Sequence, residues 1–394
     1  MRTFILRLVV VCLSFSLMGC LDSLFNDGSE KPTKAPTVTT TSLPDLGSSN
    51  FSSGTISHVV LLLPLQGSLG RSGQAVRDGF LTAYNDAPAG AKPAHVEVID
   101  TSTTNIQQAY QQAVSQGADF IVGPLAKSEV QSLNSMGSLS VPVLALNNLD
   151  PSQSINQHLY QFGLSPLDEA SQAATMAWQQ NYRSALIIVP AGSWGQNIAR
   201  EFQEQWQSQG GNVADSLYYS GSTQTLTLRL RNLLHFKQGA DKQSLPTRRH
   251  DFDVIFLAAT PDAARQIRPL LKFYYAGNMP IYATALVYTG TPQPGMDRDL
   301  DDIVFCDAPW VLTNGPNGQL RQQISVFWPG EFRQNLRLYA LGVDAYSVMT
   351  RLNSLQSSST FAGATGTLSL NDQQRIVRQL TCARFEGGVP QVVN

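Results

Sequence analysis

The chain has 394 residues, with 27 Lys or Arg against 29 Asp or Glu, and its net charge at pH 7 is −2. Because the charges nearly balance and no basic stripe is visible, the sequence argues against nucleic acid as a partner. The part with ordinary globular composition is about 340 residues long, which is more than one hydrophobic core normally uses. We therefore expect two lobes.

The N-terminus has the pattern of a lipoprotein export signal. Two arginines precede an apolar run over 8–17, which is too short to span a bilayer. The run ends in LMGC at 17–20, which resembles a bacterial lipobox. The sequence predicts a signal peptide over 1–19 and a lipidated, palmitate-bearing Cys20. The alternative is a soluble export signal with an incidental cysteine.

The residue after the predicted lipidation site is Leu21 and not Asp. By resemblance to bacterial lipoproteins, this favours the periplasmic face of the outer membrane. Residues 20–55 are rich in Ser, Thr, Pro and Gly and contain few aliphatic side chains. Such a segment cannot bury enough apolar area to offset chain entropy, so it predicts a disordered tether with an r.m.s. reach of roughly 30 Å. The folded part is expected over 56–394.

From Ile56 to about residue 300, aliphatic runs alternate with amphipathic segments. This pattern is typical of parallel sheets covered by helices on both faces. We expect lobe 1 over about 56–160 and lobe 2 over about 166–295, with a crossover at 159–168. The expected strands cover 58–63, 94–99, 119–122 and 141–145 in lobe 1, and 185–189, 213–219, 253–258 and 280–284 in lobe 2. The expected helices lie near 72–86, 104–116 and 126–136, and then near 195–209, 222–235 and 261–275.

After residue 300 the alternation breaks. Residues 302–306 predict another strand, 319–327 and 335–353 predict helices, and 363–370 with 378–391 predict an antiparallel pair. A chain that completes lobe 2 and returns to lobe 1 crosses the hinge more than once. The expected fold class is therefore α/β, with two Rossmann-like lobes joined by hinge crossovers as in type I periplasmic binding proteins.

Two cysteines remain once the signal is removed and Cys20 is acylated. Cys306 and Cys382 form an even pair, which favours one disulfide in an oxidising compartment. Two separate buried thiols are the alternative. The spacing matches no zinc motif, and we expect neither a metal site nor a cofactor.

A glycine-rich loop with Gly67, Gly70 and Gly73 joins the first strand to the first helix. A Walker A loop needs Lys after its last glycine, whereas Gln74 stands here, and the dinucleotide fingerprint needs Gly-x-Gly. Asp100 is the one acidic residue that could end the second strand beside a ribose. These departures argue against a nucleotide loop, so we expect that the segment either lines a ligand cleft or turns a corner.

Six segments in order resemble the C-terminal domain of the LpoA family: residues 61–80, 122–133, 143–148, 163–170, 258–271 and 339–348. LpoA proteins are outer-membrane lipoproteins that activate a class A penicillin-binding protein, a bifunctional peptidoglycan synthase of cell-wall growth and cell shape. The resemblance implies a type I binding-protein fold used for protein contact, without catalysis. It covers about residues 57–390.

The family usually carries an N-terminal helical-repeat domain before this domain. Here only the expected tether precedes Ile56, and no 34-residue helical repeat is visible. On this pattern a flexible tether would have to reach across the periplasm. Full extension costs a flexible tether more free energy than it costs a stiff helical spacer.

A hydrolase is one alternative function. Ser193 lies between a strand and a helix in Ala-x-Ser-x-Gly, a relative of the nucleophile elbow. The only later histidines, His235 and His250, precede the strand at 253–258, whereas the base normally follows the last strands. We expect that Gly192 and Gly195 shape the turn and that Ser193 caps the helix.

A small-molecule receptor is the second alternative, binding an amino acid or a cell-wall fragment between the lobes. Arg71 and Lys127 are the nearest charges to the expected cleft, which favours a neutral or anionic ligand. The candidate cleft-lining residues follow the predicted strands: Gln66, Ser68, Pro124, Asn147, Asn148, Ser193, Trp194, Tyr219, Thr260 and Tyr288.

Overall fold

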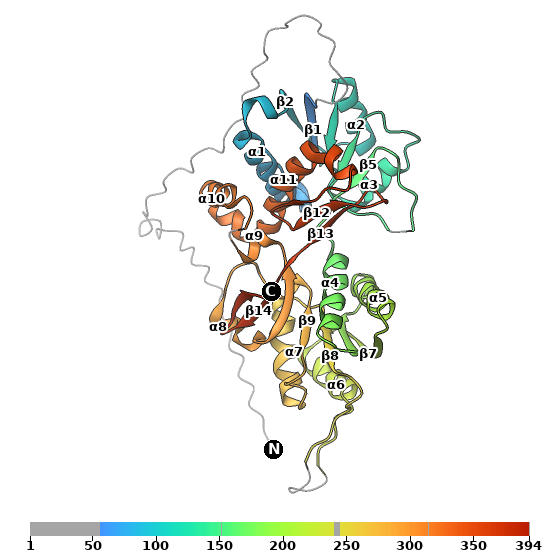
Figure 1. Cartoon of the computed structure of the whole chain (residues 1–394), viewed down its shortest axis with the longest axis vertical. Helices are drawn as coiled ribbons and strands as arrows, with labels where there is room; N and C mark the ends of the chain where they lie inside the picture. The colour runs from blue at the N-terminus through green and yellow to red at the C-terminus, as the bar shows by residue number, and fades with distance from the viewer. Residues whose placement is uncertain (1–55, 151, 240–244, 314, 394) are drawn as a thin grey trace, which may run out of the picture. The chain divides into compact units, whose positions relative to one another are not determined.

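The computed structural model describes residues 56–150, 152–239, 245–313 and 315–393. The predicted signal peptide, Cys20 and the predicted tether lie outside the described residues. One parallel sheet, one mostly parallel sheet and one small antiparallel sheet organise the described part (Figure 1). No helix in these ranges is long and apolar enough to cross a membrane.

The first sheet has the order β2-β1-β3-β4-β5, and all of its strands are parallel. Alternate residues of β1 enter different cores: Leu61 packs with α1 side chains, and Leu62 packs with those of α2 and α3. This period-two alternation explains why β1 is apolar throughout. The strands are β1 (His58–Leu63), β2 (His95–Asp100), β3 (Phe120–Val122), β4 (Val143–Ala145) and β5 (Leu159–Gln161). The helices are α1 (Gly70–Asp86), α2 (Ile106–Ser115) and α3 (Lys127–Asn134), with short 3-10 turns at η1 (Gly67–Leu69) and η2 (Ala89–Ala91).

The second sheet repeats the arrangement and extends it. Its order is β15-β14-β10-β9-β8-β6-β7, in which β14 and β15 run antiparallel to their neighbours. The strands are β6 (Ser184–Pro190), β7 (Asn212–Tyr219), β8 (Val254–Leu257), β9 (Ile281–Ala283), β10 (Ile303–Asp307), β14 (Thr381–Glu386) and β15 (Val389–Val392). The helices are α4 (Pro166–Gln179), α5 (Ser193–Ser208), α6 (Thr223–Leu233), α7 (Pro261–Phe273) and α8 (Pro294–Asp297), with turns at η3 (Ala285–Val287) and η4 (Arg298–Leu300).

In both sheets the first parallel strand lies between the second and the third. The resulting order 2-1-3-4-5 is one of the two common doubly wound orders of α/β folds. The predicted fold class is confirmed. The crossover predicted at 159–168 contains two further elements, because β5 joins the first sheet and α4 begins at Pro166.

The chain then returns to the first sheet through α9 (Pro309–Leu312), α10 (Gly318–Phe327) and α11 (Pro329–Gln356). Helix α11, orange-red in Figure 1, packs along the blue α1. The two backbones touch where each helix has a glycine: a Cβ on Gly79 would lie 2.3 Å from the carbonyl oxygen of Tyr339, and one on Gly342 would lie 2.1 Å from that of Val76. Only glycine permits so close an approach.

The C-terminal strands differ from the prediction. The segment 363–370 supplies β12 (Thr367–Leu370), which pairs with β11 (Phe361–Ala362) and β13 (Ile376–Gln379) in the small sheet. Most of 378–391 instead forms the β14–β15 hairpin of the second sheet. Gly387 and Gly388 both have positive φ, which suits a two-residue hairpin turn and explains why this segment pairs with itself.

Cys306 of β10 lies directly opposite Cys382 of β14, with their Cα atoms 3.9 Å apart, and the structure joins the two sulfur atoms in a disulfide. The sequence had left two buried thiols open as the alternative. The bridge closes a separation of 76 residues. It fastens the returning strand β14 to the last parallel strand of the second sheet.

We expect non-reducing peptide mapping of the exported protein to find Cys306 and Cys382 in one linked pair. Replacing both with Ala should lower the free energy of unfolding by roughly 4 kcal/mol in the chain-entropy model, because the unfolded chain regains its loop freedom. Urea unfolding of the two proteins measures this difference. Free thiols at both positions would contradict the bridge.

Gly342→Ala should destabilise the protein by about 1–3 kcal/mol, because the new methyl group meets backbone atoms of α1 that cannot rotate away. Gly295→Ala is the matched control, since a Cβ there meets no atom within 4 Å. Urea unfolding curves compare the two variants. Equal stabilities would show that α1 and α11 do not pack as described.

Candidate functional site

A pocket of about 640 Å³ lies at the carboxyl ends of the first-sheet strands and the start of α5. Three of the ten predicted cleft residues line it: Asn147, Asn148 and Trp194. Its volume is within the range of small-molecule sites. The other lining residues are Lys127, Leu149, Asp150, Ser152, Gly163, Leu164, Ser165, Pro166, Leu167, Asn197, Ile198, Arg200, Glu201, Glu204 and Arg375.

The charges in this pocket already have partners. Lys127 Nζ lies 2.6 Å from Asp150 Oδ1, and Arg200 Nε lies 3.9 Å from Glu204 Oε1. Arg375 is paired with Asp168. An anionic ligand would have to compete with a carboxylate for each of these cations.

A smaller apolar pocket of about 240 Å³ adjoins the first and shares Asn147 and Leu164 with it. Leucines form most of its wall, from the loops after β3 and β4 and from α11. These leucines stand where a site for a charged ligand would need polar groups to orient it. The lining residues are Leu69, Ser72, Leu125, Leu146, Asn147, Leu164, Leu338 and Leu341.

The glycine-rich loop is a tight corner. A Cβ on Gly73 would lie 1.8 Å from the carbonyl oxygen of Pro64, so α1 starts against the end of β1. Asp100 holds the loop: its carboxylate accepts hydrogen bonds from Leu65 N at 2.9 Å, from Gln66 Nε2 at 3.0 Å and from Ser102 Oγ at 2.6 Å. These bonds keep the pKa of Asp100 well below its usual range. The Asp100 carboxylate and the Gln66 amide are thus committed to the loop.

The turn before α5 repeats this construction. Gly192 has φ of 106°, and a Cβ on Gly195 would lie 1.9 Å from the carbonyl oxygen of Pro190. Gly192 is the N-cap and makes no side-chain cap bond, while Ser193 is the first helical residue. The prediction that Ser193 caps the helix is therefore wrong, because the glycine required for the turn occupies that position.

The remaining candidates lie apart from the pocket. Tyr219 donates its hydroxyl hydrogen to the carbonyl oxygen of Ala258 at 3.2 Å, and Thr260 caps α7. Tyr288 corrects the prediction: it is buried, with 4% exposure, and packs against Phe305 and Phe385 instead of facing a cleft. Ser68 lies in η1, and Pro124 follows β3 with its carbonyl oxygen bonded to Leu146 N.

Charged side chains accompany the crossings between the two sheets. Ser165 caps α4, and Asp168 in its first turn pairs with Arg375 and lies 3.7 Å from Arg378. Farther along, Arg337 of α11 donates to Asp307 at the end of β10 at 2.9 Å. None of these groups was singled out from the sequence, although the Ser-Pro-x-Asp-Glu start of α4 is a helix signal.

Glu169, in the first turn of α4, is a titratable group at these crossings whose pKa is clearly shifted. Its Oε2 accepts from Ala285 N at 2.9 Å. Burial raises the pKa of Glu169 to about 7; nearby Asp307 adds to the rise, and Arg378 and Arg337 oppose it.

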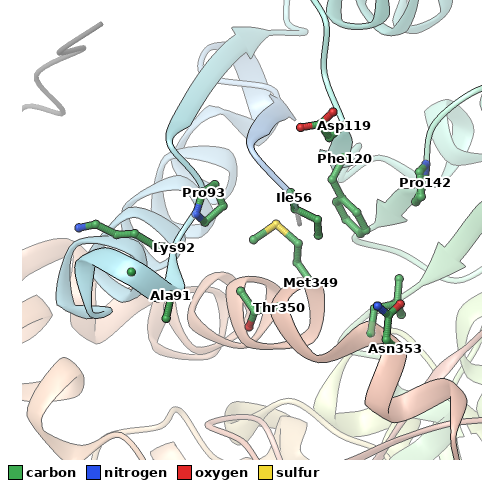
Figure 2. A pocket seen from close by; sticks show the side chains of 12 residues that line it. Ile56, Ala91, Lys92, Pro93, Asp119, Phe120, Pro142, Met349, Thr350 and Asn353 are labelled. Carbon is green, nitrogen blue, oxygen red and sulfur yellow. The ribbon is translucent and has the colours of Figure 1, made fainter. Parts of the chain in front are cut away.

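Two more features lie at the amino ends of the first-sheet strands. A pocket of about 510 Å³ lies between these ends and α11. Figure 2 shows Ile56, Phe120 and Met349 on its walls. Close to Ile56 in the chain, His58 approaches His95 and Glu97, a combination that could hold a metal ion. The sequence predicted no metal site.

The fold is that of type I periplasmic binding proteins. The chain is similar in fold to a putative branched-chain amino acid ABC transporter protein from Rhodospirillum rubrum, with a TM-score of 0.68 at 15% identity over 86% of this chain and 100% of that one. More specifically, residues 28–388 match the family model of the LppC putative lipoproteins, and the chain belongs to that family.

The relatives are LpoA proteins. The chain is 29% identical over 346 residues to the penicillin-binding protein activator LpoA of Vibrio vulnificus, covering 82% of this chain and 56% of the relative. It also matches the LpoA (YraM) C-domain from Haemophilus influenzae, described as a regulator of PBP1A, with a TM-score of 0.70 and 26% identity over 86% of this chain and 100% of that domain. The resemblance to the LpoA family is confirmed. The chain spans about half the length of this curated relative.

Glu169→Gln should flatten the pH dependence of stability. Between pH 4.5, the ordinary pKa, and about 7, the folded protein keeps a proton on Glu169 that the unfolded chain releases. The free energy of unfolding of the wild type therefore falls as pH rises through this window, by up to about 3 kcal/mol relative to the variant. Urea unfolding from pH 4.5 to 8 measures this. The exposed Glu204→Gln is the control, and parallel curves for wild type and Glu169→Gln would contradict the burial of an ionisable Glu169.

Proposed function

We propose that this chain is a lipid-anchored activator of a class A penicillin-binding protein and acts by direct protein contact. The observation that carries the proposal is the match to the complete C-domain of the H. influenzae LpoA, a regulator of PBP1A, over 86% of this chain. The relatives named penicillin-binding protein activators align over 82% and 84% of this chain. To activate, the chain must bind the active conformation of the synthase more tightly than the inactive one, by the factor of activation.

A role without catalysis agrees with the geometry around Ser193. This residue follows the carboxyl end of β6, whereas His235 and His250 precede β8 and thus lie toward the opposite edge of the sheet. A serine nucleophile needs a base within hydrogen-bond reach, and neither of these two histidines lies at the carboxyl ends of the strands. Ser193 is better explained as part of the turn that Gly192 and Gly195 require.

The LppC membership and the sequence support the proposed location. The family consists of putative lipoproteins, and Cys20 stands at the expected lipidation position. We place the chain on the periplasmic face of the outer membrane, anchored through Cys20, with 1–19 removed as signal peptide and 20–55 as tether. Two or more acyl chains make such an anchor stable.

The pocket of about 640 Å³ supports a second candidate function, a receptor for a neutral ligand such as a cell-wall fragment. Asn147, Asn148 and Trp194 would offer amide groups and an aromatic surface. The paired charges and the leucines of the adjoining pocket count against it as the main function.

The activation test uses the full-length chain in detergent with its cognate class A synthase and no added small molecule. We expect the rate of glycan polymerisation or peptide crosslinking to rise with the chain concentration and to saturate, because stimulation depends on complex formation. The matched control is the same chain unfolded and with its disulfide reduced. An unchanged rate, together with a rise of several degrees in melting temperature on adding a muropeptide or amino acid, would favour the receptor instead.

Cys20→Ala tests the anchor. Without the thiol, no acyl chain can be attached, so the protein should remain unprocessed or leave the outer-membrane fraction. Cell fractionation followed by immunoblotting measures this, with Cys306→Ala plus Cys382→Ala as the control that retains Cys20. Undiminished recovery of Cys20→Ala in outer membranes would rule out lipidation at this residue.

A further inference from the structure

Three metal-binding side chains converge at the start of the first sheet. His58 opens β1 and His95 opens β2, and the two residues are direct partners in the parallel register, with ring centroids 4.6 Å apart. Glu97 lies two residues along β2 and therefore points to the same face as His95. The three ligand atoms all lie within 4.8 Å of one another.

The ring of His58 is incompletely satisfied. Its Nε2 atom is buried and has no hydrogen-bond partner among the described residues. The closest approach to a carboxylate is 3.8 Å, to Glu97 Oε2, which is longer than a hydrogen bond. A buried polar atom without a partner needs a physical reason, and a role as a ligand of a metal ion is one such reason.

We propose that His58, His95 and Glu97 form a binding site for a zinc ion with an open fourth position. Two imidazoles and one carboxylate are one established donor set of three-ligand zinc sites, whereas calcium and magnesium prefer oxygen alone. Ligand atoms about 2.0–2.1 Å from a tetrahedral ion lie roughly 3.3 Å apart. Side-chain rotation can close the observed separations, because neither His95 nor Glu97 is buried.

The backbone around His58 is fixed independently of any ion. Asp119 Oδ2 accepts hydrogen bonds from Ser57 N at 2.9 Å and from His58 N at 2.8 Å. Asp119 also borders the pocket of Figure 2. A zinc ion would join the edge strand β2 to its neighbour β1, close to the point where the predicted tether enters the domain.

The experiment uses full-length chain without a polyhistidine tag, stripped with a chelator and kept in detergent, and titrates zinc chloride by calorimetry. We expect one equivalent to bind with a dissociation constant of about 10 µM or tighter. His58→Ala, His95→Ala and Glu97→Gln should each weaken binding at least tenfold. The exposed His250→Ala is the matched control and should keep the wild-type affinity.

Urea unfolding in chelator checks that each variant folds. If His58→Ala does not fold, His95→Ala carries the test, since His95 is only half-buried. A crystal soaked in zinc should show anomalous scattering between the three side chains. Absence of saturable binding below about 100 µM, or equal loss in His250→Ala, would overturn the proposal.

Discussion

The fold depends on charged groups that are taken out of water where the chain passes between its sheets. Asp168 lies just after the first crossing, Asp307 just before the second, and Asp344 binds the turn that leads toward the third. Asp344 accepts from Ala364 N at 2.8 Å and from Thr365 N at 2.7 Å, and burial raises its pKa to about 6. Removing one partner of a mostly buried ion pair such as Asp168–Arg375 typically costs about 3–5 kcal/mol, because the remaining charge loses its compensation. These contacts therefore specify the route of the chain strongly.

The ion pairs and the packing of α11 on α1 also shape the pocket at the cleft. Arg375 lines the cleft pocket but is held by Asp168, and the other cations there also have carboxylate partners. Leucines of α11 reach the adjoining pocket because Gly79 and Gly342 bring α11 against α1. Such a cleft has few unpaired charged groups for a small charged ligand. This agrees better with protein contact as the main role.

The sequence predicted the elements that follow from periodicity, since strands such as β1 and β6 are buried on both faces. It did not predict α4, although Ser165, Pro166 and the acidic residues after them mark a helix start, because 159–168 was interpreted only as a crossover. Tyr288 was misplaced because the turn η3 directs the chain inward after β9. The approach of His58 to His95 depends on strand register, which no local pattern records.

The measurement that tests the central claim most directly is the affinity of the full-length chain for the purified cognate class A synthase, in detergent and without any small molecule. Saturable binding with a dissociation constant of about 10 µM or tighter is what a direct-contact activator requires. If no binding is detected at ten times that concentration, while both proteins are folded, the account of this chain as a contact activator is contradicted.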